Sequence, residues 1–191
     1  RHDPVAQARA ACAGGARVVQ LRAKHATDAE ALAWGREIRA LTRAAKLLLV
    51  MNDRVDLALA CGADGVHLGQ DDLPPVDARR IAPQLAIGRS THDADQLARA
   101  LAEPIDYVAY GPLFGTASKQ TGYEARGLAA LREIATQRGP RPLVAIGGID
   151  ASNCAGVRAA GAQGFAVISA VANAGDPLAA VRELVAAWAR A

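Results

Sequence analysis

Residues 55–72, VDLALACGADGVHLGQDD, contain one complete unit of the pattern that decides the fold. The leading VDLALAC is amphipathic and predicts a helix, and the apolar run Gly65–Leu68 predicts a buried strand. Between them, GADG predicts a turn from helix to strand, which we call a joint. Glycine suits the joint because it accepts the left-handed backbone conformation that ends many helices. Polar residues follow the strand at Gln70, Asp71 and Asp72.

The same unit recurs along the chain, with glycine joints also at residues 14–16 and 161–164. Apolar runs predict strands at Arg17–Leu21, Leu47–Met51, Gly65–Leu68, Leu85–Ser90, Tyr107–Tyr110, Leu143–Ile146 and Gly164–Ile168. Amphipathic stretches predict helices at Asp3–Ala13, Asp28–Ala45, Val55–Cys61, Val76–Ala82, Asp93–Leu101, Leu128–Thr136, Ser152–Ala160 and Pro177–Ala189. Asp3, Asp28 and Ser152 are the helix-start signals. Continuous apolar runs favour a parallel sheet that is covered on its outer face.

The predicted strands and helices alternate, but the first helix has no strand before it. An α/β fold of the (β/α)₈ TIM barrel type, with its first strand missing from the given chain, accounts for this mismatch. We therefore expect an apolar segment of about 4–8 residues before Arg1, lying between the strands that end at Leu21 and Ile168. Residues 1–191 are expected to form one barrel domain. The alternative is an open doubly wound sheet, but the first strand–helix turn, Arg22–His25, is not a GxGxxG sequence.

Composition excludes several classes of protein. Hydrophobic residues make up 51% of the chain, which argues against disorder, and no apolar run approaches the about 18 residues of a membrane span. A net charge of +3 without blocks of basic residues, together with few aromatic residues, argues against nucleic-acid binding. The cysteines, Cys12, Cys61 and Cys154, are far apart, which favours a reducing, cytoplasmic location. The sequence leaves open whether copies of the chain form a homo-oligomer.

Polar residues that follow the strands are the candidate site, because barrel enzymes build their sites at the carboxyl ends of strands. Three cations, Arg22, Lys24 and Lys119, would meet there with the amide of Asn52 and the carboxylates of Asp53 and Asp72. Cations and carboxylates converge where a polyphosphate is held both directly and through Mg²⁺. On the far side, residues 147–148 (Gly-Gly) and Ser169 are candidates for a second phosphate site. Two phosphate sites imply two phosphorylated ligands or one long one.

Two covalent mechanisms find little support in the sequence. No cysteine follows a predicted strand, so no thiolate nucleophile is expected at the mouth. Lys24 and Lys119 lie in polar loops rather than in apolar pockets, which argues against a Schiff base.

Six sequence motifs in order resemble those of thiamine phosphate synthases, and together they span nearly the whole chain. They are QLRAK at residues 20–24, NDR at 52–54, HLGQDD at 67–72, GRSTH at 88–92, GP at 111–112 with Thr116 and Lys119, and AIGGI at 145–149. The resemblance implies a barrel, Mg²⁺ and two substrates. These are 4-amino-2-methyl-5-hydroxymethylpyrimidine diphosphate and the phosphate of 4-methyl-5-(2-hydroxyethyl)thiazole or its carboxylated form.

The resemblance also implies roles for individual residues. The pyrimidine diphosphate would be held by Gln20, Arg22, Lys24, Asn52, Ser90 and Lys119, of which Arg22, Lys24, Ser90 and Lys119 are the candidate catalytic residues. Mg²⁺ would be held by Asp53 and Asp72. The thiazole phosphate would be held by Thr116, Ser118, Gly148, Ile168 and Ser169, with Ala117 contributing only backbone. The implied mechanism is dissociative: pyrophosphate leaves first, and the thiazole nitrogen then attacks the pyrimidine methylene cation.

Simpler interpretations compete at several positions. Asp72 could cap the following helix, His67 is expected to be a packed polar residue, and Asp64 is expected to be structural. His92 at the mouth is a candidate for proton transfer. Two rival functions remain: a thiazole tautomerase, for which His92 would supply the acid–base group, and a non-catalytic sensor of phosphorylated ligands.

Overall fold

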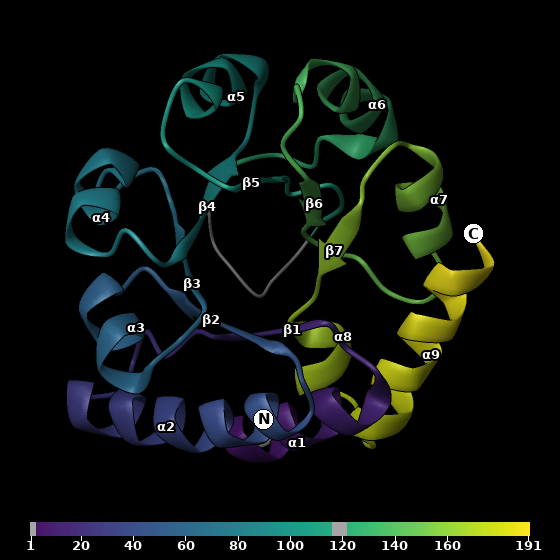
Figure 1. Cartoon of the computed structure of the whole chain (residues 1–191). Helices are drawn as coiled ribbons and strands as arrows, with labels where there is room; N and C mark the ends of the chain where they lie inside the picture. Colours follow the sequence, from purple (N-terminus) through teal and green to yellow (C-terminus); the bar gives the residue numbers. More distant parts are fainter. Residues whose placement is uncertain (1–2, 116–121) are drawn as a thin grey trace.

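The computed structural model describes residues 3–115 and 122–191, and in them a parallel sheet curls around a central axis with helices outside it (Figure 1). The strands are β1 (Val18–Leu21), β2 (Leu48–Asn52), β3 (Gly65–Leu68), β4 (Ala86–Thr91), β5 (Tyr107–Tyr110), β6 (Leu143–Ile146) and β7 (Gly164–Ala166). Their order in the sheet is their order in the chain, and each neighbouring pair is parallel. This order excludes the doubly wound alternative, in which the spatial order of the strands departs from their order in the chain.

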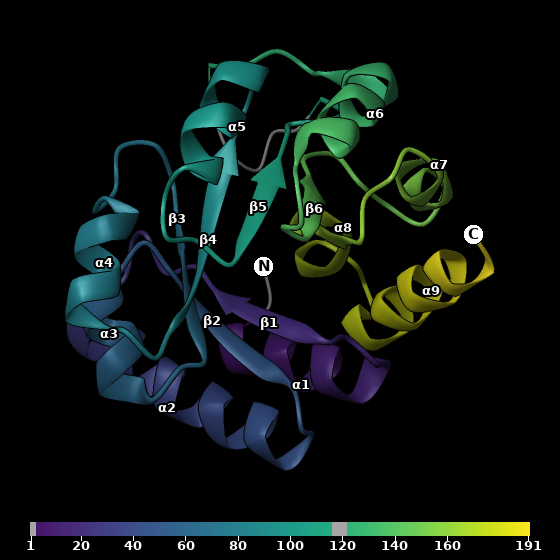
Figure 2. The same cartoon turned by 45° about the horizontal axis from the view of Figure 1, so that its top comes forward.

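Helices alternate with the strands and form the outer layer, as the turned view in Figure 2 shows. They are α1 (Pro4–Gly14), α2 (Asp28–Ala44), α3 (Val55–Cys61), α4 (Pro75–Ile81), α5 (Ala94–Leu101), α6 (Gly127–Gln137), α7 (Cys154–Ala159), α8 (Ser169–Ala172) and α9 (Pro177–Arg190). The barrel-type α/β fold predicted from the sequence is confirmed. No helix in the described part of the chain is long and apolar enough to cross a membrane.

The sheet remains open between its first and last strands. Within the described residues β1 pairs with β2 and β7 pairs with β6, and the two outer edges do not pair with each other. The predicted additional strand before Arg1 lies outside the described residues and stays a prediction. The helical layer does continue across this gap, because α1 packs against α9. A Cβ atom on Gly14 would lie 2.4 Å from Cγ1 of Val181, so glycine permits this close helix contact.

The predicted elements are confirmed to within two residues, and the differences have local causes. Strand β7 ends at Ala166 instead of Ile168, and the short helix α8, which the sequence pattern did not predict, follows it. Ser152 does not start α7: its hydroxyl donates to Oδ1 of Asp150, and the helix begins at Cys154. Thr27, rather than Asp28, caps α2 and forms a reciprocal capping box with Glu30.

The joints at the amino ends of the strands share a hydrogen-bonding arrangement. At three joints the side chain of the residue just before a strand accepts a hydrogen bond from a backbone N–H of the preceding strand. Asp64 accepts from Leu49, Asp106 from Ile87 and Gln163 from Leu143, at 2.7–2.8 Å. Helix arginines reach two of these carboxylates, Arg39 to Asp64 and Arg79 to Asp106, each at 2.6 Å. Asp64 is therefore structural, as predicted.

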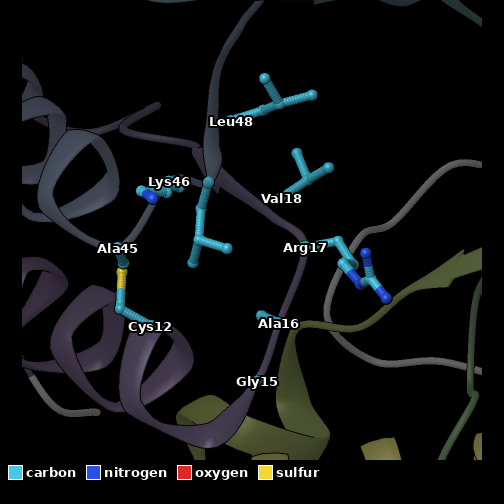
Figure 3. Close-up of a pocket in the computed structure, with 9 residues that line it drawn as sticks. Cys12, Gly15, Ala16, Arg17, Val18, Ala45, Lys46 and Leu48 are labelled. Atoms are coloured by element: carbon cyan, nitrogen blue, oxygen red, sulfur yellow. The ribbon is translucent and has the colours of Figure 1, made fainter.

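A depression lies at this same end of the barrel. It has a volume of about 580 Å³ and is lined by the first residues of β1 and β2 and by the ends of α1 and α2. Figure 3 shows Val18 and Leu48 beside it, and these two apolar side chains are 47% and 51% exposed. The depression therefore lies at the end of the barrel opposite to the predicted site.

Candidate active site

Polar side chains gather where the first three strands end, as predicted. Lys24 follows β1, Asp53 follows β2 and Asp72 lies in the loop after β3. The Lys24 ammonium forms an ion pair with Oδ2 of Asp53 at 2.8 Å. Strand adjacency therefore brings the predicted cation and both predicted carboxylates into one cluster.

Asp53 reaches this cluster through an unusual backbone conformation. Its φ is +64°, in the left-handed region, which aspartate tolerates better than most residues with a side chain. Its N–H donates to the carbonyl of His67 on β3 at 2.8 Å, which ties the turn to the next strand. The neighbouring Arg54 bridges Asp28 and Asp56 and so fixes the turn to α2 and α3.

The Asp53 and Asp72 carboxyl groups lie close enough for each to shift the pKa of the other. Burial alone would raise the pKa of Asp53, but hydrogen bonds from Lys24 and Asp72 and the charges of Lys24 and Arg22 bring that pKa below its ordinary value. Burial and the adjacent Asp53 raise the pKa of Asp72. The two neighbouring carboxyl groups therefore differ in acidity, and a cation between them would relieve their mutual repulsion.

Asp72 also has a backbone partner, which decides between two interpretations. Its Oδ2 accepts from the N–H of Gly69 at 2.6 Å, within its own loop. Pro74 occupies the cap position of α4, and no side chain caps that helix. The interpretation of Asp72 as a helix cap is therefore wrong, and its carboxyl group faces Asp53.

This donor set suits Mg²⁺ better than it suits a metal ion whose ligands all come from the protein. Among residues 3–115 and 122–191, no three His, Cys, Asp or Glu side chains gather in a metal-binding group. Mg²⁺ is commonly bound through one or two carboxylates, with substrate phosphates and water completing its coordination. The Asp53–Asp72 pair fits that description.

Ser90 lies near the end of β4 in a buried polar network. Its Oγ lies 2.8 Å from Nε2 of His67, and Nδ1 of His67 lies 2.9 Å from the hydroxyl of Tyr107. The carbonyl of Ser90 accepts from Nε2 of Gln70 at 2.6 Å. His67 is thus a packed polar residue, as predicted, but it contacts a predicted substrate-binding residue.

The other predicted pyrimidine-binding residues lie mostly around the same cluster. Gln20 lies on the face of β1 opposite Val19 and Leu21, which are buried in the core. Arg22 lies close enough to Asp53 to lower its pKa, and Asn52 ends β2 one residue before Asp53. Lys119 lies outside the described residues.

The predicted thiazole-phosphate residues come from the opposite side of the mouth. Gly148 follows β6, Ile168 lies between β7 and α8 with 41% of its surface exposed, and Ser169 begins α8. Thr116, Ala117 and Ser118 lie outside the described residues.

Residues 147–148 form a glycine turn that has no room for side chains. Both glycines have left-handed φ values, +91° and +65°. A Cβ atom would lie 2.5 Å from Cα of Pro112 at position 147, and 2.7 Å from Cβ of Phe114 at position 148. The turn thus packs against the loop after β5, and bare backbone at this place is compatible with close approach of a phosphate.

Other predicted side chains at the mouth have structural partners. His92 is 4% exposed, contacts the carbonyl of Gly111 through Nδ1 and stacks on Tyr123 at 3.9 Å between ring centroids. The cysteines lie in α1, α3 and α7 rather than directly after a strand, and burial raises the pKa of each thiol. No described thiol is thus available as a nucleophile at the mouth.

Sequence reasoning missed Tyr107 as part of the site, and it placed Gln70 at the mouth without giving it a role. Both act on Ser90, Tyr107 through His67 and Gln70 through the Ser90 carbonyl. Tyr107 begins β5, so its position in the sequence gave no sign that its hydroxyl reaches β3. The alignment of Tyr107 with Gly88 on the neighbouring strand is the signal, and it becomes visible only once the strand register is known.

Comparisons with known proteins agree with this geometry. Residues 1–171 match the family described as thiamine monophosphate synthase. The chain is 52% identical over 187 residues to the thiamine-phosphate synthase of Anaeromyxobacter dehalogenans, covering 97% of this chain and 83% of that protein. It is 47% identical over 174 residues to that of Thermus thermophilus, covering 91% of this chain and 84% of that protein.

Solved structures give the same result. The thiamine phosphate pyrophosphorylase of Pyrococcus furiosus superposes with a TM-score of 0.91 at 39% identity, covering 97% of this chain and 89% of that one. A 3-hexulose-6-phosphate synthase superposes with a TM-score of 0.71 at 20% identity, covering 96% of this chain and 92% of that one. At that identity the second likeness concerns the fold alone.

Proposed function

Since the chain belongs to the thiamine monophosphate synthase family, an enzyme family of thiamine biosynthesis, we propose that it couples two phosphorylated substrates. One is 4-amino-2-methyl-5-hydroxymethylpyrimidine diphosphate, and the other is 4-methyl-5-(2-hydroxyethyl)thiazole phosphate or its carboxylated form. The products are thiamine phosphate and pyrophosphate, with loss of CO₂ from the carboxylated form. The observation that carries this proposal is the cluster of Lys24, Asp53 and Asp72 at the ends of three successive strands.

The cluster would bind the leaving diphosphate. Mg²⁺ held by Asp53 and Asp72 would neutralise part of the charge that develops on the departing oxygens. Lys24 and Arg22 would contact the remaining oxygens, together with Lys119. Ser90, Gln20 and Asn52 would orient the pyrimidine. Burial and the neighbouring Asp53 raise the pKa of Asp72, and a cation between the two carboxylates would offset both effects, which supports a cation at that position.

The reaction we propose is dissociative. The bond between the pyrimidine methylene carbon and the diphosphate oxygen breaks, and its electron pair leaves with pyrophosphate. The lone pair of the thiazole nitrogen then forms the new C–N bond. The glycine turn after β6 and Ser169 would hold the thiazole phosphate so that its ring lies beside the pyrimidine. The protein positions both rings and excludes water from the cation.

Neither rival function is favoured. A tautomerase that binds only the thiazole phosphate has no use for the Asp53–Asp72 pair, and His92 is tied to Gly111 and Tyr123. Membership of an enzyme family argues against a non-catalytic sensor.

An assay with both substrates and Mg²⁺, followed by pyrophosphate release and product mass, tests the proposal. We expect thiamine phosphate only when both substrates are present. Matched reactions that omit each substrate in turn are the controls. Isomerisation of the thiazole phosphate alone, with no coupling at any Mg²⁺ concentration, would assign the chain to the tautomerase activity instead.

A further inference from the structure

Three residues form a line across the middle of the sheet. His67 on β3 pairs in register with Gly88 on β4, and Gly88 pairs in register with Tyr107 on β5. Side chains at aligned positions of a parallel sheet point to the same face. Ser90 lies two residues beyond Gly88 and so shares that face.

Gly88 leaves the space that lets Tyr107 reach His67. A Cβ atom at position 88 would lie 2.0 Å from Cζ and 2.4 Å from the hydroxyl oxygen of Tyr107. Any side chain there would displace the phenol. With glycine in the middle strand, the Tyr107 ring lies over β4 and its hydroxyl comes within 2.9 Å of Nδ1 of His67.

Hydrogen-bonding chemistry then fixes the direction of each bond. Burial raises the pKa of Tyr107, so its hydroxyl keeps its proton and needs an acceptor. Among the residues that the structure describes, its hydrogen-bond partner is Nδ1 of His67. A neutral imidazole has one donor and one acceptor nitrogen, so an acceptor at Nδ1 places the ring proton on Nε2. In that tautomer Nε2, which lies 2.8 Å from Oγ of Ser90, donates to it.

We propose that Tyr107 and His67 are positioning residues that make Ser90 a hydrogen-bond donor toward the pyrimidine diphosphate. With its oxygen accepting from His67, the Ser90 hydroxyl directs its own proton toward an acceptor atom of that substrate. This inference rests on the proposed function, in which Ser90 contacts the pyrimidine substrate. Without Tyr107, either nitrogen of His67 can carry the proton, and Ser90 loses its fixed orientation.

Tyr107→Phe removes the hydroxyl with little change in shape and is the main test. We expect kcat/KM for the pyrimidine diphosphate to fall about three- to tenfold, the effect of one net hydrogen bond, with KM for the thiazole phosphate unchanged. In a Ser90→Ala background the same substitution should cost less than about twofold, because its effect acts through Ser90. Tyr110→Phe is the matched control: Tyr110 is buried at the other end of β5, lies on the other face, and should retain wild-type kinetics.

Equal losses from Tyr107→Phe in the wild-type and Ser90→Ala backgrounds would overturn the proposal, because they would indicate a general structural effect. Gly88→Ala provides a second route, since it displaces the phenol while retaining its hydroxyl. It should reproduce the selective loss of kcat/KM for the pyrimidine diphosphate. Wild-type kinetics in a folded Gly88→Ala protein would also contradict the proposal.

Histidine ¹⁵N NMR tests the proton placement without any substrate. The chain has four histidines, so a His67→Gln spectrum assigns the His67 signals. We expect the ring proton on Nε2 in the wild type and a mixture of both tautomers in Tyr107→Phe. A proton on Nδ1 in the wild type would overturn the inference. If the wild-type protein does not join the two substrates, the proposed function fails. The NMR experiment still decides the orientation of the hydrogen-bond network.

Discussion

At the scale of single residues, the neighbouring carboxyl groups of Asp53 and Asp72 are the groups that we propose would bind a divalent cation. The pKa of Asp53 is lowered while that of Asp72 is raised, so two similar groups differ in acidity. The asymmetry arises because Lys24 pairs directly with Asp53. These pKa directions are the physical basis of a mutational prediction.

Asp53→Ala and Asp72→Ala are each expected to lower pyrophosphate release about 100-fold or more, because each removes a ligand of the ion that neutralises the leaving group. The double variant should be little worse than either single one, since both residues act through one ion. The measurement is the rate of release against Mg²⁺ concentration. Asp71→Ala, in the adjacent exposed residue, is the matched control and should behave as wild type. Full activity in EDTA, or single variants with wild-type Mg²⁺ dependence, would contradict the prediction.

The sequence predicted this cluster because strand ends follow directly from apolar periodicity. Once Asp53 and Asp72 are placed after neighbouring parallel strands, their proximity needs no further information. The network of Ser90, His67 and Tyr107 could not be predicted in the same way. It depends on the register of three strands and on the space above Gly88, and local sequence patterns specify neither.

At the scale of elements, the joints at the amino ends of the strands connect helices to the sheet. Asp64 accepts from the Leu49 N–H and pairs with Arg39 of α2, and Asp106 does the same with Ile87 and Arg79 of α4. The structural role of Asp64 was predictable because the residue belongs to a glycine joint. Helix α8 was not, because an element spanning Ser169–Ala172 is too short to show a helical period.

Asp64→Ala is expected to lower the free energy of unfolding by about 1–2 kcal/mol, because the Leu49 N–H loses its acceptor. Asp64→Asn keeps an acceptor oxygen and should cost less. Denaturant unfolding measures both variants, and Asp106→Ala should behave like Asp64→Ala. Coupling activity should remain at the wild-type level, since the joint lies at the end of the barrel away from the site. An Asp64→Ala protein with unchanged stability, whether or not it retains coupling activity, would show that this assignment of Asp64 is wrong.

At the scale of the whole molecule, binding at the mouth should stabilise the native state. A ligand that binds only the native state at about 100 times its Kd adds about 2.7 kcal/mol. For a chain of this size that corresponds to an increase in Tm of about 5–10 °C. We expect this increase with Mg²⁺ and pyrophosphate together, and little change with pyrophosphate in EDTA. Thermal unfolding of Asp53→Ala under the same conditions is the control and should show no increase. An equal increase in that variant would place the ligand elsewhere.

The consecutive strand order has a consequence for how the chain reaches its native state during synthesis. Neighbouring strands in the sheet β1–β7 are also consecutive in the chain, so each strand after β1 pairs with the strand made just before it. The growing sheet can therefore accept one strand at a time as it leaves the ribosome. The contact between α1 and α9 is different, because it joins the first helix to the last. Docking of α9 on α1 near Gly14 is therefore a step that must wait until α9 itself has left the ribosome.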